Sequence, residues 1–283
     1  MTPVSRKEVT IGVDIGTTAV KAVAADEDGQ VVARARIPHQ LRVPAPDLLE
    51  HDADEAWRQG PLAVLDRLAR PDASAVAVSA MVPSLTAVDP GGRPVTPGLL
   101  YGDSRGRVPA ALDDALPPVG EAAEFLRWTA CQAPAAAGYW PAQAVANYAL
   151  AGAAVIDFAT AYTTLPLFDG TGWSVAACAE CGVTVDVMPR VETTGAAAGQ
   201  VRGTDTVLAV GAIDALCEQI VAGADHDGDV LVLCGTTLIA WVTIPGPGRC
   251  AACGPFRTRP RGRARLAGRA TRAACSSAGW TAC

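Results

Sequence analysis

Two short segments of this chain combine residue types that bind phosphate groups and divalent cations. In the first, Asp14 precedes Gly16, Thr17 and Thr18, and Lys21 follows three residues later. A tight turn that contains glycine exposes successive backbone N–H groups, and threonine hydroxyls add donors, so this segment predicts a concave site for phosphate oxygens. An aspartate at a strand end can hold Mg²⁺ through water, because Mg²⁺ keeps several waters and takes few carboxylates. The pattern GxxxxGK[ST] does not occur, which indicates a different way of binding phosphates.

The triplet Gly-Thr-Thr occurs again at Gly235, Thr236 and Thr237. Alternating and β-branched residues predict a strand on both sides of each triplet, at Val9–Ile15, Ala19–Ala25, Asp229–Leu233 and Leu238–Ile244. Either triplet alone would be consistent with a plain hairpin turn. The recurrence favours two related halves that face each other across a cleft.

A third candidate is Asp214, which follows Gly211-Ala212-Ile213 at the start of a helix expected over Val210–Ala224. One interpretation is an acidic residue that stabilises the helix dipole. The other is a general base that accepts the proton of a hydroxyl as it attacks a phosphoryl group. The residues by themselves leave both open.

The elements that would position these residues are strands followed by helices. A third strand is expected over Gln30–Ile37, further strands over Ala73–Ala80 and Leu85–Val88, and helices over Gly120–Cys131 and Pro141–Ala151. Three strands joined by short turns form a meander, and the later mixture predicts an α/β domain.

Composition excludes several classes of function. Half of the 283 residues are hydrophobic, the net charge is −6 and the pI is about 5.1, which argues against a nucleic-acid or membrane-surface role. We find neither a signal-peptide pattern nor an apolar run long enough for a membrane span, and we expect a cytoplasmic protein with reduced cysteines. Two CxxC pairs, Cys178/Cys181 and Cys250/Cys253, lack nearby histidines, so zinc is the weaker interpretation.

The last part of the chain differs from the rest. No acidic residue follows Asp229, whereas eight arginines lie between Arg249 and Arg272. Residues 246–283 are therefore expected to be an aberrant, disordered basic tail. Two explanations for this basic segment are open. It is a basic arm that binds nucleic acid or anionic lipid, or it results from a frameshift in a GC-rich gene.

Six segments, taken in order, resemble the FGGY carbohydrate kinases, a family that includes xylulose, glycerol and gluconate kinases. The segments lie at 11–28 (IGVDIGTTAVKAVAADED), 50–57 (EHDADEAW), 76–105, 156–173, 210–224 (VGAIDALCEQIVAGA) and 232–242 (VLCGTTLIAWV). The resemblance implies an actin-like ATPase (ribonuclease H-like) fold with a mixed sheet and flanking helices.

The resemblance also implies roles for individual residues. Asp14 would hold Mg²⁺ through water and Asp214 would be the catalytic base. The residues expected to bind ATP are Asp14, Gly16, Thr17, Thr18, Lys21, Gly235, Thr236 and Thr237. The residues expected to line the sugar site are Met81, Val82, Pro83, Asp103 and Arg105.

The chain departs from the family pattern at three places. These departures bear on which substrate is expected more than on which reaction is expected. Xylulose kinases carry Gly-Gln-Met-His-Gly where this chain has Ala80-Met81-Val82-Pro83-Ser84. The pattern Trp-Asn-Asp-x-Arg reads Tyr101-Gly102-Asp103-Ser104-Arg105, and a triple glycine has become Gly211-Ala212-Ile213.

Together these features predict a sugar-binding domain at residues 1–228, the start of an incomplete ATP-binding domain at 229–245, and the tail. The expected function is ATP-dependent transfer of the γ-phosphoryl group to a sugar or polyol hydroxyl, impaired by truncation. A non-catalytic fragment that binds sugar weakly is the alternative. Another actin-like ATPase, such as a chaperone, would not account for residues 76–105. We expect no nucleic-acid or membrane partner, and a homodimer is one option for assembly.

Overall fold

The computed structural model describes residues 8–107, 120–224, 226–234, 238–244, 253–257 and 264–270. The chain divides into two compact units, Met1–Asp214 and Ala215–Cys283. We expected the division near residue 228. It falls earlier because helix α6 (Asp214–Ala222) packs with the strands that follow it: the buried Gln219 side chain donates a hydrogen bond of 3.0 Å to Thr243 Oγ1.

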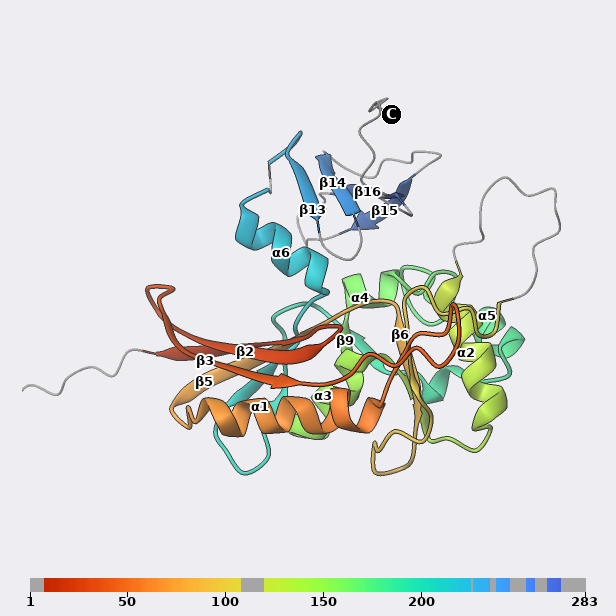
Figure 1. Cartoon of the computed structure of the whole chain (residues 1–283), viewed down its shortest axis with the longest axis horizontal. Helices are drawn as coiled ribbons and strands as arrows, with labels where there is room; N and C mark the ends of the chain where they lie inside the picture. The colour runs from red at the N-terminus through yellow and green to blue at the C-terminus, as the bar shows by residue number, and fades with distance from the viewer. Residues whose placement is uncertain are drawn as a thin grey trace, which may run out of the picture. The chain divides into compact units, whose positions relative to one another are not determined.

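The first unit is built on a six-stranded mixed sheet (Figure 1). Its strands, in the order in which they lie side by side, are β11 (Ala197–Gln200), β12 (Val207–Ala209), β5 (Ala73–Ala80), β1 (Val9–Ile15), β2 (Ala19–Asp26) and β3 (Val31–Pro38). Strands β1, β2 and β3 form the antiparallel meander that the sequence predicts, and β5 runs parallel to β1.

Successive side chains of β1 point to opposite faces of this sheet. Odd-numbered residues from Val9 to Ile15 are buried, and the even-numbered ones, including Asp14, lie on the opposite face. Helices α1 (Gly60–Leu68) and α3 (Ala142–Ala151) lie together on one side of the sheet (Figure 1). The helix expected from Pro141 is thus confirmed, and it ends at Gly152, whose φ of 73° suits a residue without a Cβ.

A second, four-stranded sheet belongs to the same unit and forms its own core. Its strands, in order, are β4 (Glu50–His51), β7 (Gly98–Leu100), β6 (Ser84–Val88) and β8 (Gly138–Trp140). Helix α2 (Glu121–Gln132) packs against β6 and buries Phe125 and Leu126 beside Leu85 and Leu99.

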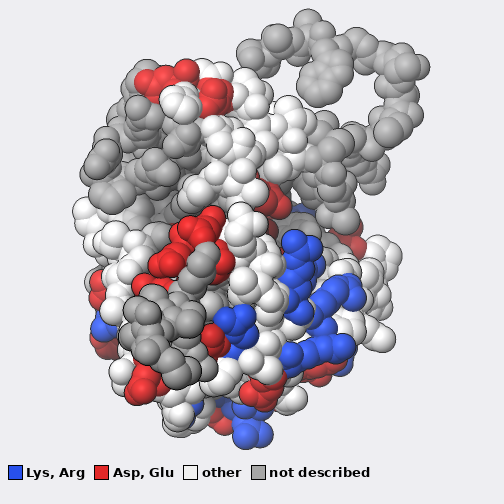
Figure 2. Space-filling view, turned by 90° about the vertical axis from the view of Figure 1, so that its left-hand side faces the viewer, with Lys and Arg blue, Asp and Glu red and all other residues white. Residues whose placement is uncertain are grey.

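Short elements complete the first unit. They are a π-helical turn (Asp54–Gln59), β9 (Val155–Asp157), α4 (Phe158–Tyr162), α5 (Val175–Glu180), a 3-10 turn (Val185–Val187) and β10 (Arg190–Glu192). The described helices include none with the length and apolar character needed to cross a bilayer. Figure 2 shows groups of Asp and Glu beside groups of Lys and Arg on one face, so charges of both signs share that surface.

The second unit contains α6 and a four-stranded antiparallel sheet. The strand order is β13 (Val230–Cys234), β14 (Leu238–Ile244), β16 (Ala264–Ala270) and β15 (Cys253–Arg257). The strands expected on either side of Gly235 are present and pair from Cys234 with Leu238 onward. Within residues 246–283, for which we expected disorder, the structure has two strands, because the free edge of β14 pairs with β16 and β16 pairs with β15.

Candidate functional site

The first predicted phosphate segment forms a tight turn at the end of β1. Gly16 N–H donates to the Ala19 carbonyl at 3.1 Å and closes the hairpin that contains Thr17 and Thr18. The sheet register places Asp14 between Lys21 on β2 and Ser79 on β5, with all three on the same face. The predicted residues of this segment therefore lie together at the carboxyl end of β1.

Asp14 and Ser79 are the side chains on which the predicted water-mediated magnesium site would depend. Burial raises the pKa of Asp14, and the charge of Lys21, whose Nζ lies 3.4 Å from Asp14 Oδ2, opposes that shift. Ser79 Oγ is buried and has no hydrogen-bond partner in the described part of the chain, so it can bond to a water of the metal's shell. Among the described residues, no group of three or more His, Cys, Asp or Glu could hold a metal directly. One carboxylate with waters is a donor set that Mg²⁺ accepts.

The carboxyl ends of β1 and β5, together with the bridged residue Ile213, bring the predicted catalytic and binding residues to the same end of the sheet. Ile15 of β1 pairs with Ala80 of β5, and Ala80 forms a parallel bridge with Ile213. The residues that follow these three positions are Gly16, Met81 and Asp214. In open α/β sheets, ligands bind outside the carboxyl ends of the strands. The predicted phosphate hairpin, the predicted sugar loop and the candidate base therefore lie at the same end of the sheet.

The segment before Asp214 is extended rather than helical, which corrects the helix predicted to begin at Val210. Val210 N–H donates to the Ala196 carbonyl at 2.9 Å, and the Val210 carbonyl accepts from Gly195 at 2.8 Å. A Cβ at Gly211 would lie 2.0 Å from the Val78 carbonyl oxygen, so only glycine allows this close approach. These contacts hold the backbone against β5 until the helix begins at Asp214.

The predicted sugar loop begins directly after β5. Met81 is buried and its N–H donates to the Ile15 carbonyl at 3.3 Å, whereas Val82 and Pro83 are half-buried. This bond joins the start of the sugar loop to the strand that carries Asp14. The loop is apolar, so groups that read hydroxyls must come from elsewhere.

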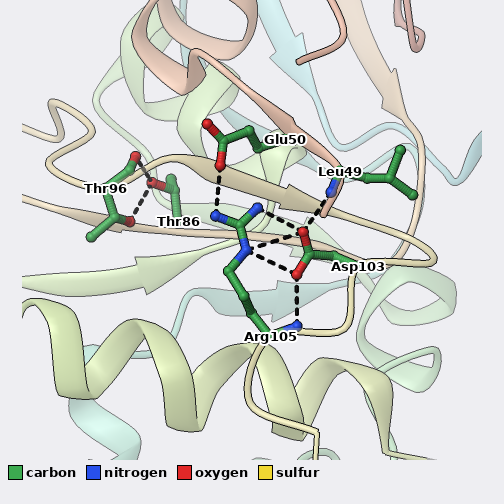
Figure 3. A network of polar contacts seen from close by, with 6 residues as sticks. All are labelled: Leu49, Glu50, Thr86, Thr96, Asp103 and Arg105. Carbon is green, nitrogen blue, oxygen red and sulfur yellow. Dashed lines mark hydrogen bonds and ion pairs between the residues drawn. The ribbon is translucent and has the colours of Figure 1, made fainter. Parts of the chain in front are cut away.

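Asp103 and Arg105 form a closed network with Glu50 (Figure 3). Asp103 is fully buried, and its carboxylate accepts from Arg105 Nε at 2.9 Å, Arg105 Nη2 at 2.6 Å and Leu49 N–H at 2.6 Å. Arg105 Nη1 donates to Glu50 Oε2 at 2.6 Å, and its guanidinium lies 4.9 Å from the centre of the Trp128 ring. A sugar hydroxyl could reach Asp103 only by displacing one of these bonds.

The structure adds contacts that the sequence did not predict. Tyr101 OH lies 3.1 Å from Thr17 Oγ1, and His51 Nε2 lies 2.8 Å from the Thr17 carbonyl oxygen. His51 belongs to the segment EHDADEAW, which the resemblance includes without a stated function. Ser79 stands at the end of an expected strand, where the sequence carries no signal for it. Gly235, Thr236 and Thr237 lie outside the described residues.

Part of this chain, including the first hairpin, is similar in sequence to known proteins. Residues 9–110 match the family model described as "FGGY family of carbohydrate kinases, N-terminal domain". An apulose kinase from Pectobacterium atrosepticum is 36% identical over 101 residues, which are 34% of this chain and 20% of that protein. A gluconokinase from Bacillus subtilis is 32% identical over 102 residues, or 34% and 19% of the two chains. The chain thus matches about one fifth of the length of these curated relatives.

Solved structures show the fold. A xylulose kinase from Rhodospirillum rubrum superposes with a TM-score of 0.78 at 22% identity, covering 92% of this chain and 60% of that chain. A gluconate kinase from Lactobacillus acidophilus gives a TM-score of 0.75 at 17% identity, covering 93% and 59%. The predicted actin-like ATPase fold, with its mixed sheet and flanking helices, is confirmed.

Proposed function

We propose that this chain, whose residues 9–110 match the N-terminal domain model of the FGGY family of carbohydrate kinases, transfers the γ-phosphoryl group of ATP to a hydroxyl of a sugar or polyol. The observation that carries the proposal is that Gly16, Met81 and Asp214 each follow one of three paired residues, which are Ile15 of β1, Ala80 of β5 and the bridged Ile213. A phosphate donor and an alcohol acceptor must meet at one place, and this end of the sheet supplies groups for both.

Each group at this end of the sheet has a proposed task. Backbone N–H groups and hydroxyls at Gly16, Thr17 and Thr18 bind phosphate oxygens, with Lys21 as a nearby positive charge. Asp14 holds Mg²⁺ through water, and that ion neutralises charge on the phosphates when it is bound. Gly235, Thr236 and Thr237 are proposed to bind phosphate from the second unit.

Asp214 is the proposed general base. Its carboxylate accepts the proton of the substrate hydroxyl as that oxygen attacks the γ-phosphorus and the bond to the β-phosphate oxygen breaks, which leaves ADP. A positioned base contributes about 10²- to 10⁴-fold to the rate of such a transfer.

The sugar site is proposed at the loop of Met81, Val82 and Pro83 together with Tyr101 and Arg105. Asp103 is assigned a supporting task there, because its carboxylate is buried and bonded to Arg105. The relatives named above act on different sugars, and we leave the substrate at the level of a sugar or polyol. A cytoplasmic location and a homodimeric assembly stay predictions from the sequence.

The proposal is tested by measuring ADP formation from ATP and Mg²⁺ with a panel of ketoses, aldoses, sugar acids and polyols. The wild-type chain is compared with Asp214→Asn and with a control, Asp205→Asn, which alters an exposed carboxylate in a turn. We expect sugar-dependent turnover that falls at least about 100-fold in Asp214→Asn and stays unchanged in Asp205→Asn. Equal turnover in all three chains would contradict the proposal. Thermal stabilisation by a sugar without ADP formation would support the non-catalytic sugar binder instead.

A further inference from the structure

Thr17, at the tip of the proposed phosphate hairpin, is held from two directions by side chains distant in sequence. Its carbonyl oxygen lies 2.8 Å from His51 Nε2, and its hydroxyl lies 3.1 Å from Tyr101 OH. His51 ends strand β4, and Tyr101 follows strand β7, which pairs with β4. Both contacts therefore come from the second sheet of the first unit, which also carries the Asp103–Arg105 network.

The surroundings of His51 decide which of its ring nitrogens carries the proton. The Trp57 indole N–H can only donate, and it lies 3.0 Å from His51 Nδ1, so Nδ1 must be the acceptor. Burial lowers the pKa of His51 to about 4, which leaves the ring neutral at pH 7 with its single proton on Nε2. His51 therefore donates to the Thr17 carbonyl. Both side chains are fully buried, and His39 packs edge-on against the His51 ring at 4.4 Å.

This hydrogen bond fixes the plane of a peptide in the hairpin. In a trans peptide the carbonyl and the next N–H point in opposite directions. A Thr17 carbonyl held by His51 therefore directs the Thr18 N–H toward the opposite side of the hairpin. A rotation of this peptide would turn the carbonyl oxygen, rather than the N–H, toward an anion on that side.

We infer that His51 is a positioning residue that holds the Thr17–Thr18 peptide in the orientation needed to bind phosphate, and that Tyr101 links the same threonine to the sugar loop. The inference rests on the proposed function, since it assigns a task to residues that support the proposed phosphate site. His51 touches neither substrate in this account and acts only through Thr17. Tyr101 connects the two substrate sites because it precedes Asp103 and Arg105 in one short segment.

Variants of His51 separate the hydrogen bond from the volume of the ring. His51→Gln keeps an N–H donor near the position of Nε2, whereas His51→Leu fills a similar space without a donor. Trp57→Phe removes the donor that fixes the tautomer, and Tyr101→Phe removes only the hydroxyl. Each variant is made in the full chain, and thermal unfolding identifies any that fails to fold.

The first readout is backbone hydrogen exchange, which does not depend on turnover. We expect His51→Leu to speed exchange in the hairpin at residues 14–20 about tenfold, with little change in helix α3 of the same unit. His51→Gln should restore slow exchange, and Tyr101→Phe should show a smaller effect in the same segment. Unchanged hairpin exchange in His51→Leu, or equal acceleration in α3, would overturn the inference. If His51→Leu does not fold, Trp57→Phe and Tyr101→Phe decide by the same comparison.

The second readout is the kinetics of ADP formation with the sugar that the panel identifies. We expect His51→Leu to lower kcat about tenfold while KM for the sugar changes less than about twofold, and His51→Gln to recover most of kcat. A rise in sugar KM alone would overturn the positioning role. Absence of turnover in the wild-type chain would count against the proposed function, and the exchange comparison would still decide whether His51 holds the hairpin.

Discussion

Asp103 and Asp72 each pair with an arginine two residues away, yet their surroundings differ. Asp103 is fully buried and the Arg105 side chain is 13% exposed, whereas the side chains of Arg70 and Asp72 are 23% and 29% exposed. A buried pair that loses one member leaves a charge without compensation, and an exposed pair does not. The same two residue types therefore carry different energetic weight in this chain.

Asp103→Asn should lower the free energy of unfolding by about 1–3 kcal/mol, because Arg105 keeps only Glu50 as a charged partner and the new amide group faces the N–H donors of Arg105 and Leu49. Urea denaturation measures the change. Asp72→Asn, the matched control at the exposed pair, should cost less than about 1 kcal/mol. Similar losses in both variants would show that burial does not distinguish the two pairs.

The sequence predicted site residues whose expected chemistry is local, and it gave no sign of contacts between residues that lie far apart along the chain. Asp14, Gly16 and Thr17 lie within one hairpin, and the strand–turn–strand pattern was sufficient to predict that hairpin. His51 and Tyr101 meet Thr17 across 34 and 84 residues of chain, so neither spacing nor residue type revealed these two contacts. Asp103 was predicted to contact sugar, but its burial depends on Leu49, Glu50 and Arg105 together.

At the scale of elements, alternation predicted strands well, whereas helix starts depended on tertiary contacts. Strand β1 occupies the predicted range, and β3 extends over Val31–Pro38 where Gln30–Ile37 was expected. The apolar run from Val210 predicted a helix, yet its first four residues are extended because the backbone at Gly211 lies against β5. Where an apolar run fits both the helix period and the strand period, contacts with a neighbouring strand decide which structure forms.

Gly211→Ala should disturb this packing, since the new Cβ would lie 2.0 Å from the Val78 carbonyl oxygen. Overpacking of this kind costs about 1–3 kcal/mol, and the required shift lies three residues before Asp214. We expect a lower urea midpoint and a lower kcat than in the wild-type chain. Gly172→Ala is the control, because a Cβ there meets nothing within 4 Å and the change should be neutral. A stable and fully active Gly211→Ala would show that the backbone adapts without cost to the site.

At the scale of the molecule, the residues proposed to bind the sugar and those proposed to bind ATP are distributed differently over the two units. The residues assigned to the sugar all lie in Met1–Asp214, whereas those assigned to ATP are divided between that unit and Ala215–Cys283. The proposed function therefore predicts that a sugar contacts residues of the first unit only.

Hydrogen exchange of the full chain with each ligand alone tests this division. A sugar that supports turnover should slow exchange in residues 80–107 and leave the C-terminal unit unchanged, because ligand binding protects the segments it contacts. ADP with Mg²⁺ should slow exchange in residues 14–21 and in peptides that contain Gly235–Thr237. Protection of Gly235–Thr237 by sugar alone would contradict the assignment.

Strands β1 and β5 pair in parallel, and residues 16–72 separate them along the chain. During translation the meander of β1, β2 and β3 emerges first, and one edge of β1 stays uncovered until β5 has been synthesised. An uncovered strand edge is a template for pairing with another chain. A chaperone would therefore help the nascent chain while the residues between Pro38 and Ala80 are being synthesised. Codons that slow the ribosome over these residues would prolong the time for which the edge of β1 is uncovered.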